Sequence, residues 1–147
     1  MDDIEAIEQV QARYCRAADT SDWDLLRSTI TDDFSCDTGS QGQGATVGVE
    51  AFVERMDGIP AVTVHHAVLP EIELTSPTSA TGIWAVHNFA KLPDGTAIDG
   101  YGHYRNAYEK VDGSWRLSVL KLEWLHQEAR PGPTPPSGAE QLPEARE

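Results

Sequence analysis

Two adjacent histidines and one aspartate are the residues of this chain whose types are best suited to moving a proton. His65 and His66 lie in an alternating stretch, so one of them faces each side of a strand. Histidine transfers protons readily near neutral pH, although a histidine on a strand can also be purely structural. Asp19 follows an apolar helical pattern, where its carboxylate would face the negative end of the helix and favour a nearby cation, donor or proton. A solvated aspartate that starts a turn also fits this position.

The strand pattern leaves open which histidine is buried. His66 shares its face with Val62, Val64 and Val68, which favours the core for that face and water for His65. A curved sheet that covers a pocket on one face and a subunit on the other would bury both histidines. The two interpretations predict opposite surroundings for His65.

Further polar and aromatic residues are candidates for a pocket. Tyr14 lies on the apolar stripe of the first helix, either as a core tyrosine or as a group that faces a ligand. Asn88 interrupts an apolar strand, and a buried asparagine needs partners from the backbone or from a ligand. Tyr104 lies on the following strand. Trp84 and Trp124 also lie on strands and are most simply core or interface residues.

Composition excludes several classes of function. The chain has 24 acidic and 11 basic residues and a net charge of −13, which disfavours nucleic-acid and membrane partners. It lacks a phosphate-binding glycine motif, a GxSxG elbow and metal-ligand spacing, so neither a metal nor a cofactor is predicted. The N-terminal segment has no signal-peptide pattern, which predicts a cytoplasmic protein. Cys15 and Cys36 are therefore expected to be reduced.

The elements that must position these residues begin with helices. Apolar residues recur at three- and four-residue steps in the first part of the chain. Asp2 or Asp3 is the expected N-cap of the first helix, and Ser21 with Asp24 resembles a capping box that opens the second. The predicted helices cover residues 3–18, a segment over Trp23, Leu26 and Ile30, and a segment over Val49, Phe52, Val53 and Met56 closed by Gly58.

Strand patterns follow after a polar, glycine-rich loop at residues 38–48. Asp112-Gly113 is a strong hairpin turn. Helices followed by a meander of long strands predict an α+β fold, with three N-terminal helices packed on a curved, mainly antiparallel sheet. Residues 1–127 are expected to form one domain, and the proline-rich acidic segment 128–147 a disordered tail. The predicted strands cover residues 62–74 with an interruption at Pro70, 80–91, 97–110 and 114–126.

Three stretches of the chain resemble the SnoaL-like family of the nuclear-transport-factor-2-like (NTF2-like) superfamily. Residues 4–34 resemble the opening helices, residues 63–88 the first long strands, and residues 100–117 the closing hairpin with its DGxW turn. The resemblance implies a cone-shaped roll. Within the superfamily the likeness is greatest to bile-acid 7α-dehydratase, and next to scytalone dehydratase and the hexachlorocyclohexane dehydrochlorinase.

Those enzymes eliminate water or HCl without a cofactor by means of a histidine paired with an aspartate. Carried onto this chain, the histidine falls on His65, the aspartate on Asp19 and a helix tyrosine on Tyr14. Asn88 stands where the bile-acid enzyme has an aspartate, and Trp124 where it has an arginine. Because of these two departures, the resemblance does not identify the substrate.

The resemblance therefore implies a cofactor-independent lyase that performs a dehydratase-type β-elimination on a small cyclic apolar substrate such as a steroid or polyketide. The alternatives are an isomerase or cyclase of the same superfamily, or a non-catalytic small-molecule-binding protein. A homo-oligomer, either a trimer or a dimer, is also implied. The predicted site residues are His65, Asp19 and Tyr14 for catalysis, and Asn88, Tyr104, Trp84 and Trp124 for substrate contact.

Overall fold

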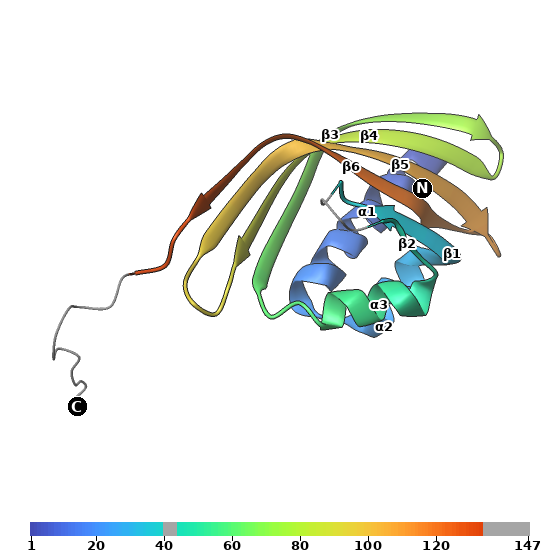
Figure 1. Ribbon diagram of the computed structural model, residues 1–147. Coiled ribbons are helices and arrows are strands. Elements are labelled where there is room, and N and C mark those ends of the chain that lie inside the picture. The colour runs from blue at the N-terminus through green and yellow to red at the C-terminus, as the bar shows by residue number, and fades with distance from the viewer. Residues whose placement is uncertain (40–43, 134–147) are drawn as a thin grey trace, which may run out of the picture.

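Three helices cover the concave face of one strongly curved sheet (Figure 1). The computed structural model describes residues 1–39 and 44–133. The six strands are ordered β2-β1-β6-β5-β4-β3, and β1 and β6 run parallel while the other neighbours are antiparallel. This arrangement confirms the predicted α+β roll. The elements are α1 (Asp3–Thr20), α2 (Trp23–Thr29), β1 (Ile30–Asp37), β2 (Thr46–Val47), α3 (Val49–Asp57), β3 (Val62–Ser76), β4 (Ser79–Lys91), β5 (Ala97–Val111) and β6 (Ser114–Arg130).

Both ends of α1 are fixed by local hydrogen bonds. The Asp2 carboxylate accepts a hydrogen bond from the backbone N–H of Glu5 at 2.8 Å, which identifies Asp2 as the N-cap. At the other end, Ser21 adopts a left-handed conformation with φ of 56° and its backbone N–H bonds to the carbonyl of Ala17. The helix thus reaches Thr20, so Asp19 lies within its last turn.

The start and the end of α2 both differ from the prediction. The N-cap is Asp22, whose carboxylate accepts from the N–H of Leu25 at 3.1 Å. The predicted Ser21–Asp24 box is wrong because Ser21 already closes α1. The predicted extension over Ile30 is also wrong, since Ile30 is extended and begins β1.

Strand β1 was not expected from the sequence. Its inward residues include Phe34 and Cys36, but two exposed aspartates, Asp32 and Asp33, interrupt the apolar alternation. The segment pairs in parallel with β6. These two strands are far apart in the chain, so a local sequence pattern cannot indicate their pairing. The short β2 lies inside the stretch that was predicted to be a loop.

The long strands agree with the predicted meander apart from their ends. Pro70 interrupts β3 as expected, through a register shift beside Leu69, whose φ is 54°. Asp112 and Gly113 both have positive φ, as a tight hairpin turn requires. Strand β6 continues to Arg130, beyond the predicted strand end at residue 126. Residues 128–130 of the predicted tail therefore belong to β6. Disorder of the remaining tail stays a prediction, and its residues 134–147 lie outside the described residues.

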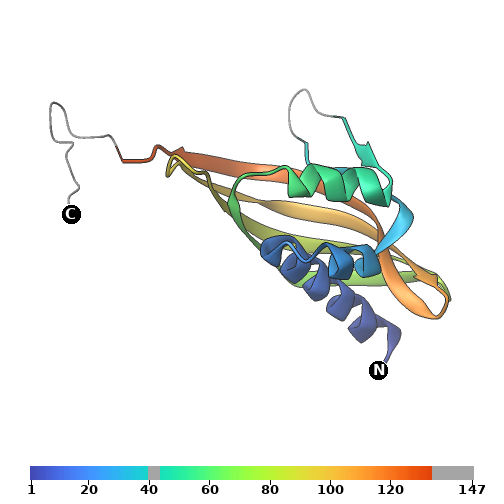
Figure 2. The same ribbon diagram turned by 90° about the horizontal axis from the view of Figure 1, so that it is seen from below.

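The helices form one layer over the sheet (Figure 2). Helix α2 contacts both α1 and α3, and α1 packs against β3 and β6. No helix in the described part of the chain is long and apolar enough to cross a membrane.

A buried polar network fastens α1 to the sheet. The hydroxyl of Tyr108 donates to Oε1 of Gln11 at 2.6 Å and accepts from Nε1 of Trp84 at 2.8 Å. The amide of Asn106 also donates to Gln11, at 3.0 Å. All four side chains are buried. Because buried polar groups are costly when unpaired, this network fixes the position of the helix that carries Asp19.

Tyr108→Phe is expected to lower the free energy of unfolding by about 1–3 kcal/mol, because Trp84 loses its acceptor and Gln11 loses one of its donors inside the core. Urea unfolding followed by circular dichroism measures the change. Tyr101→Phe is the matched control, since Tyr101 is 41% exposed and its removal should change stability by less than about 0.5 kcal/mol. Equal stability of the two variants would show that the network contributes nothing.

Candidate active site

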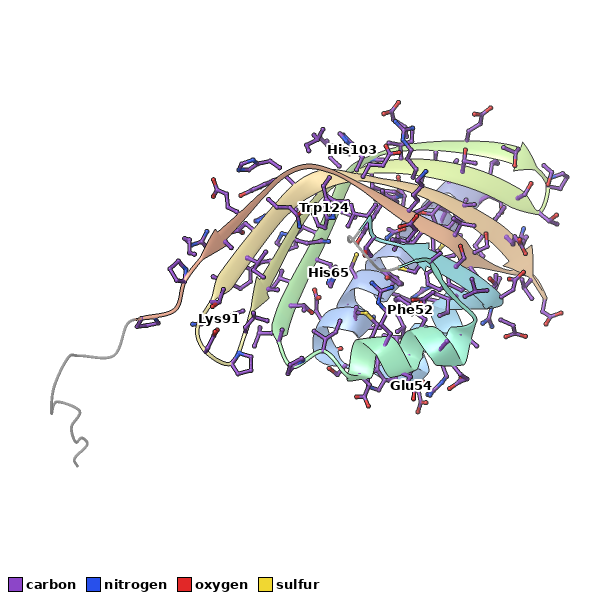
Figure 3. All side chains as sticks on the ribbon, in the orientation of Figure 1. Phe52, Glu54, His65, Lys91, His103 and Trp124 are labelled. Carbon is purple, nitrogen blue, oxygen red and sulfur yellow. The ribbon has the colours of Figure 1, made fainter. Side chains whose placement is uncertain are left out.

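The concave face of the sheet and helices α1 and α3 enclose a cavity of about 300 Å³. Figure 3 shows His65, Phe52 and Trp124 on this inner side of the sheet, whereas His103 projects from the outer side. The lining is mostly apolar, with a few polar groups that could orient a ligand. Its large apolar members are Phe52, Met56, Phe89, Leu120, Leu122 and Trp124. Its main polar members are Tyr14, Arg55, His65, Asn88, Tyr104 and Gln127.

Asp19 and His65 are hydrogen-bonded to each other. Nδ1 of His65 lies 2.5 Å from Oδ1 of Asp19, and the backbone N–H of His65 donates to Oδ2 at 2.8 Å. The Thr63 hydroxyl donates to Oδ1 at 3.2 Å. These donors from β3 offset the unfavourable position of a carboxylate at the end of α1.

The hydrogen bond also fixes which nitrogen of His65 is basic. An ionised carboxylate can only accept a hydrogen bond, so a neutral His65 paired with an ionised Asp19 has its proton on Nδ1 and its lone pair on Nε2. In the described part of the chain, no hydrogen bond is formed by Nε2. The two side chains are 17% and 21% exposed, and the His65 ring lines the cavity.

The inner face of β3 carries His65 and not the valines. His65 pairs with Asn88 in register, and both line the cavity. His66 points to the outer face together with Val62 and Val68, which are 65% and 51% exposed. The interpretation that buries the valine face in the core is therefore wrong. The reason is tertiary, since α1 packs on the opposite face of β3 and brings Asp19 there.

Two buried tyrosines with protonated hydroxyls line the cavity. Tyr14 and Tyr104 are 3% and 2% exposed. Burial raises the pKa of Tyr14 well above its usual range, while the nearby Arg55 acts in the opposite direction. Burial likewise raises the pKa of Tyr104, with a hydrogen bond to Asn88 opposing the change. Both phenols can therefore donate hydrogen bonds at neutral pH but cannot serve as bases.

Asn88 and Trp124 lie in the cavity wall. Oδ1 of Asn88 is buried and has no hydrogen-bond partner in the described residues. The indole Nε1 of Trp124 donates to the carbonyl of Thr38 at 2.9 Å. Gly100 makes room for the indole ring, because a Cβ at this position would lie only 2.3 Å from Cζ3 of Trp124.

Trp84 lies outside this cavity, contrary to the substrate contact predicted for it. Its ring is buried and its Nε1 donates a hydrogen bond to the hydroxyl of Tyr108. It borders a second, more open hollow of about 450 Å³ between α1 and β3, which His65 and Asp19 also line. Trp84 is therefore a core residue, because its only polar side-chain atom, Nε1, is hydrogen-bonded within the buried network that joins α1 to the sheet.

Arg55 is a cavity residue that the sequence patterns did not indicate. It lies in the last turn of α3, and its two terminal nitrogens donate to Thr46 Oγ1 at 2.8 Å and Thr38 Oγ1 at 3.2 Å. Phe52 and Met56, three residues before it and one after, line the same cavity. Their helical spacing on α3 is the signal that could have identified Arg55 as a pocket residue.

The two free cysteines are expected to be unreactive in the folded protein. Burial raises the pKa of Cys36 to about 11 and that of Cys15 to about 12. Since the thiolate is the nucleophile, iodoacetamide at pH 8 should leave both unmodified, and labelling should accelerate only as the pH rises toward these values. Intact-mass spectrometry with a urea-unfolded control, in which both thiols label, measures this. Rapid labelling of the folded protein at pH 8 would contradict the burial of the thiols.

Comparisons with known proteins agree with this architecture. A family model described as "SnoaL-like domain" matches residues 1–121. The curated protein "Probable cyclase FGR4" of Gibberella zeae is 27% identical over 135 residues, which cover 82% of this chain and 89% of that protein.

Two solved structures are similar throughout. The Kfla4162 protein from Kribbella flavida has 25% identity and a TM-score of 0.79, covering 86% of this chain and 93% of its own. A type 2 hexachlorocyclohexane dehydrochlorinase (LinA) has 23% identity and a TM-score of 0.78, covering 92% and 94%. The family model spans most of the chain and confirms the resemblance drawn from the sequence. The chain therefore belongs to the SnoaL-like domain family.

Proposed function

We propose that this chain is a cofactor-independent lyase that removes water from a small cyclic apolar substrate by β-elimination. The observation that carries the proposal is the 2.5 Å hydrogen bond between Asp19 and Nδ1 of His65, at a polar corner of a largely apolar cavity. An imidazole held by one nitrogen has its tautomer and orientation fixed, which prepares the other nitrogen for proton abstraction.

The reaction begins at Nε2 of His65, which takes a proton from the carbon α to a substrate carbonyl. The electron pair of the broken C–H bond passes to the carbonyl oxygen as an enolate, and Asp19 stabilises the imidazolium that forms. Return of the electrons expels the β-hydroxyl, which takes a proton from the imidazolium. The products are an unsaturated ketone and water, and His65 returns to its neutral form.

Neighbouring residues have supporting roles in this proposal. Tyr14 keeps its phenol proton, so it can donate to the developing enolate or to the leaving hydroxyl. Tyr104 can donate in the same way. Trp124 provides an apolar wall, which suits a steroid- or polyketide-like ring.

Two alternatives use the same cavity. An isomerase or cyclase would use the same base without losing water, and the similarity to the probable cyclase FGR4 favours a cyclase. A binding protein would retain its ligand unchanged.

Mass spectrometry separates these functions. Purified protein is incubated with a panel of cyclic β-hydroxy ketones and thioesters, and the products are compared with those of the His65→Ala variant. Loss of one water that depends on His65 supports the lyase. A product of unchanged mass and altered retention would support the isomerase or cyclase instead. Retention of an unaltered compound would support the binding protein.

We further propose that the chain forms a homo-oligomer through the outer face of the sheet. The helices leave that face uncovered (Figures 1 and 2). His66, His87, Tyr101 and His126 lie in register across β3, β4, β5 and β6, and the rings of His87 and Tyr101 stack at 4.6 Å. Light scattering should show a dimer or trimer that Tyr101→Glu dissociates. A monomeric wild-type protein would contradict this.

A further inference from the structure

Asp19 is held in place by hydrogen-bond donors from the sheet and not by its own helix. A carboxylate in the last turn of a helix faces the negative end of the helix dipole, and the last turn of α1 contains no basic residue that would compensate. In the part of the chain that the structure describes, the three hydrogen bonds to Asp19 all come from Thr63 and His65 of β3. The orientation of the carboxylate therefore depends on this short segment of β3.

The three donors are divided between the two carboxylate oxygens. The backbone N–H of His65 donates to Oδ2 at 2.8 Å. Nδ1 of the His65 ring lies 2.5 Å from Oδ1, and the Thr63 hydroxyl donates to the same Oδ1 at 3.2 Å. Thr63 and His65 are two residues apart, so their side chains lie on the same face of β3, and both line the cavity. Thr63 is thus next to the two groups that would move the proton.

Two of these donors hold the carboxylate independently of the imidazole ring. The backbone N–H fixes Oδ2 and the Thr63 hydroxyl fixes Oδ1, so the carboxylate cannot turn about its Cβ–Cγ bond without breaking one of these hydrogen bonds. A carboxylate oxygen has two lone pairs, and the hydroxyl at Oδ1 leaves the second one for Nδ1 of His65. If the hydroxyl is removed, the backbone N–H alone anchors Asp19 from β3, and the carboxylate can pivot away from the ring.

We infer that Thr63 is a positioning residue that holds the Asp19 carboxylate in line with Nδ1 of His65. Thr63 acts through Asp19 and makes or breaks no bond of the substrate. Its contribution to the rate rests on the proposed lyase reaction, because a base whose orientation is less well fixed abstracts a proton less efficiently. Its contribution to the hydrogen bond between Asp19 and His65 depends on no reaction, so the two contributions can be measured separately.

Proton NMR of the protein without substrate tests the contribution to the hydrogen bond. The Nδ1 proton of His65 should give a resonance downfield of the backbone amides, because it is bonded to a carboxylate and the ring is only 17% exposed. Its absence from the spectrum of His65→Ala assigns it. Thr63→Val keeps the branched shape of the side chain but lacks the hydroxyl, so this resonance should broaden through faster exchange with water. Thr63→Ser keeps the hydroxyl and should preserve the resonance.

The same variants test the contribution to the rate. Hydrogen–deuterium exchange α to the carbonyl of 2-tetralone is followed in D₂O. Thr63→Val should lower kcat by about three- to tenfold through the loss of one hydrogen bond, with KM nearly unchanged because valine has the shape of threonine. Thr63→Ser should restore most of the rate. Thr81→Val is the matched control, since Thr81 is exposed on β4, and both readouts should stay unchanged. Thermal unfolding confirms that each variant is folded.

Four results would overturn the inference. Two come from the spectra, namely no Nδ1 resonance in the wild type, or a resonance that Thr63→Val leaves unchanged. The other two come from the rates of an active wild type, namely an unchanged kcat in Thr63→Val, or an effect on KM alone, which would make Thr63 a substrate contact. If the wild type does not accelerate exchange, the proposed reaction fails, and the spectra alone decide whether Thr63 positions Asp19.

Discussion

His65→Ala is expected to lower the rate at which the protein dehydrates its substrate by about 10²–10⁴-fold, the usual contribution of a general base. The ring is the partner of Asp19 on the cavity wall, and alanine removes both the hydrogen bond and the basic nitrogen. His65 is partly exposed and does not belong to the buried core cluster, so the protein should remain folded. Initial rates with a substrate from the hydroxy-ketone panel measure the effect.

The adjacent histidine provides the control. His66 has the same side chain one residue away but points to the outer face of β3, so His66→Ala should leave the rate nearly unchanged. Circular dichroism and thermal unfolding check both variants. Full activity of a folded His65→Ala protein would refute the base function.

Phe52→Ala is expected to lower the free energy of unfolding by about 3–5 kcal/mol. Phe52 is 1% exposed and packs edge to face against Phe34 at a centroid distance of 4.9 Å, with Tyr14 at 6.3 Å. Removal of the ring leaves a void next to the cavity and removes the aromatic contacts that hold α3 against the core. Because small domains are stabilised by about 5–15 kcal/mol, this loss is a large share of the total.

Glu54 lies two residues further along α3 and points to solvent (Figure 3). Glu54→Ala should therefore change stability by less than about 0.5 kcal/mol. Urea unfolding of both variants gives the comparison. A loss below about 1 kcal/mol for Phe52→Ala would show that the aromatic cluster does not hold α3 in place.

Local patterns predicted most of the fold because the elements concerned are regular and amphipathic. Helix α1 and strands β4 and β5 follow clear periodicities, and their bounds agree with the prediction to within two residues. Strand β1 escaped detection because Asp32 and Asp33 break its alternation and because its partner β6 is distant in sequence.

The site was harder to predict than the fold. Asp19 and His65 are 46 residues apart, and spacing alone could not pair them; the family resemblance did. The alternation of β3 assigns its residues to two faces, but it does not indicate which of the two faces the helices cover. Trp84 was predicted to contact the substrate, but its indole N–H is hydrogen-bonded to Tyr108 in the network that joins α1 to the sheet. Arg55 was not predicted, because the sequence pattern of α3 is that of an ordinary short amphipathic helix.

Hydrogen–deuterium exchange tests most directly whether His65 is a base that faces the cavity. A cyclic ketone such as 2-tetralone is incubated with the protein in D₂O, and proton NMR follows the loss of the signal α to the carbonyl. This readout needs proton abstraction but no leaving group. The proposal predicts that the wild type and His66→Ala accelerate exchange over buffer and that His65→Ala does not. Exchange at the buffer rate with the wild type, or undiminished acceleration by His65→Ala, would contradict it.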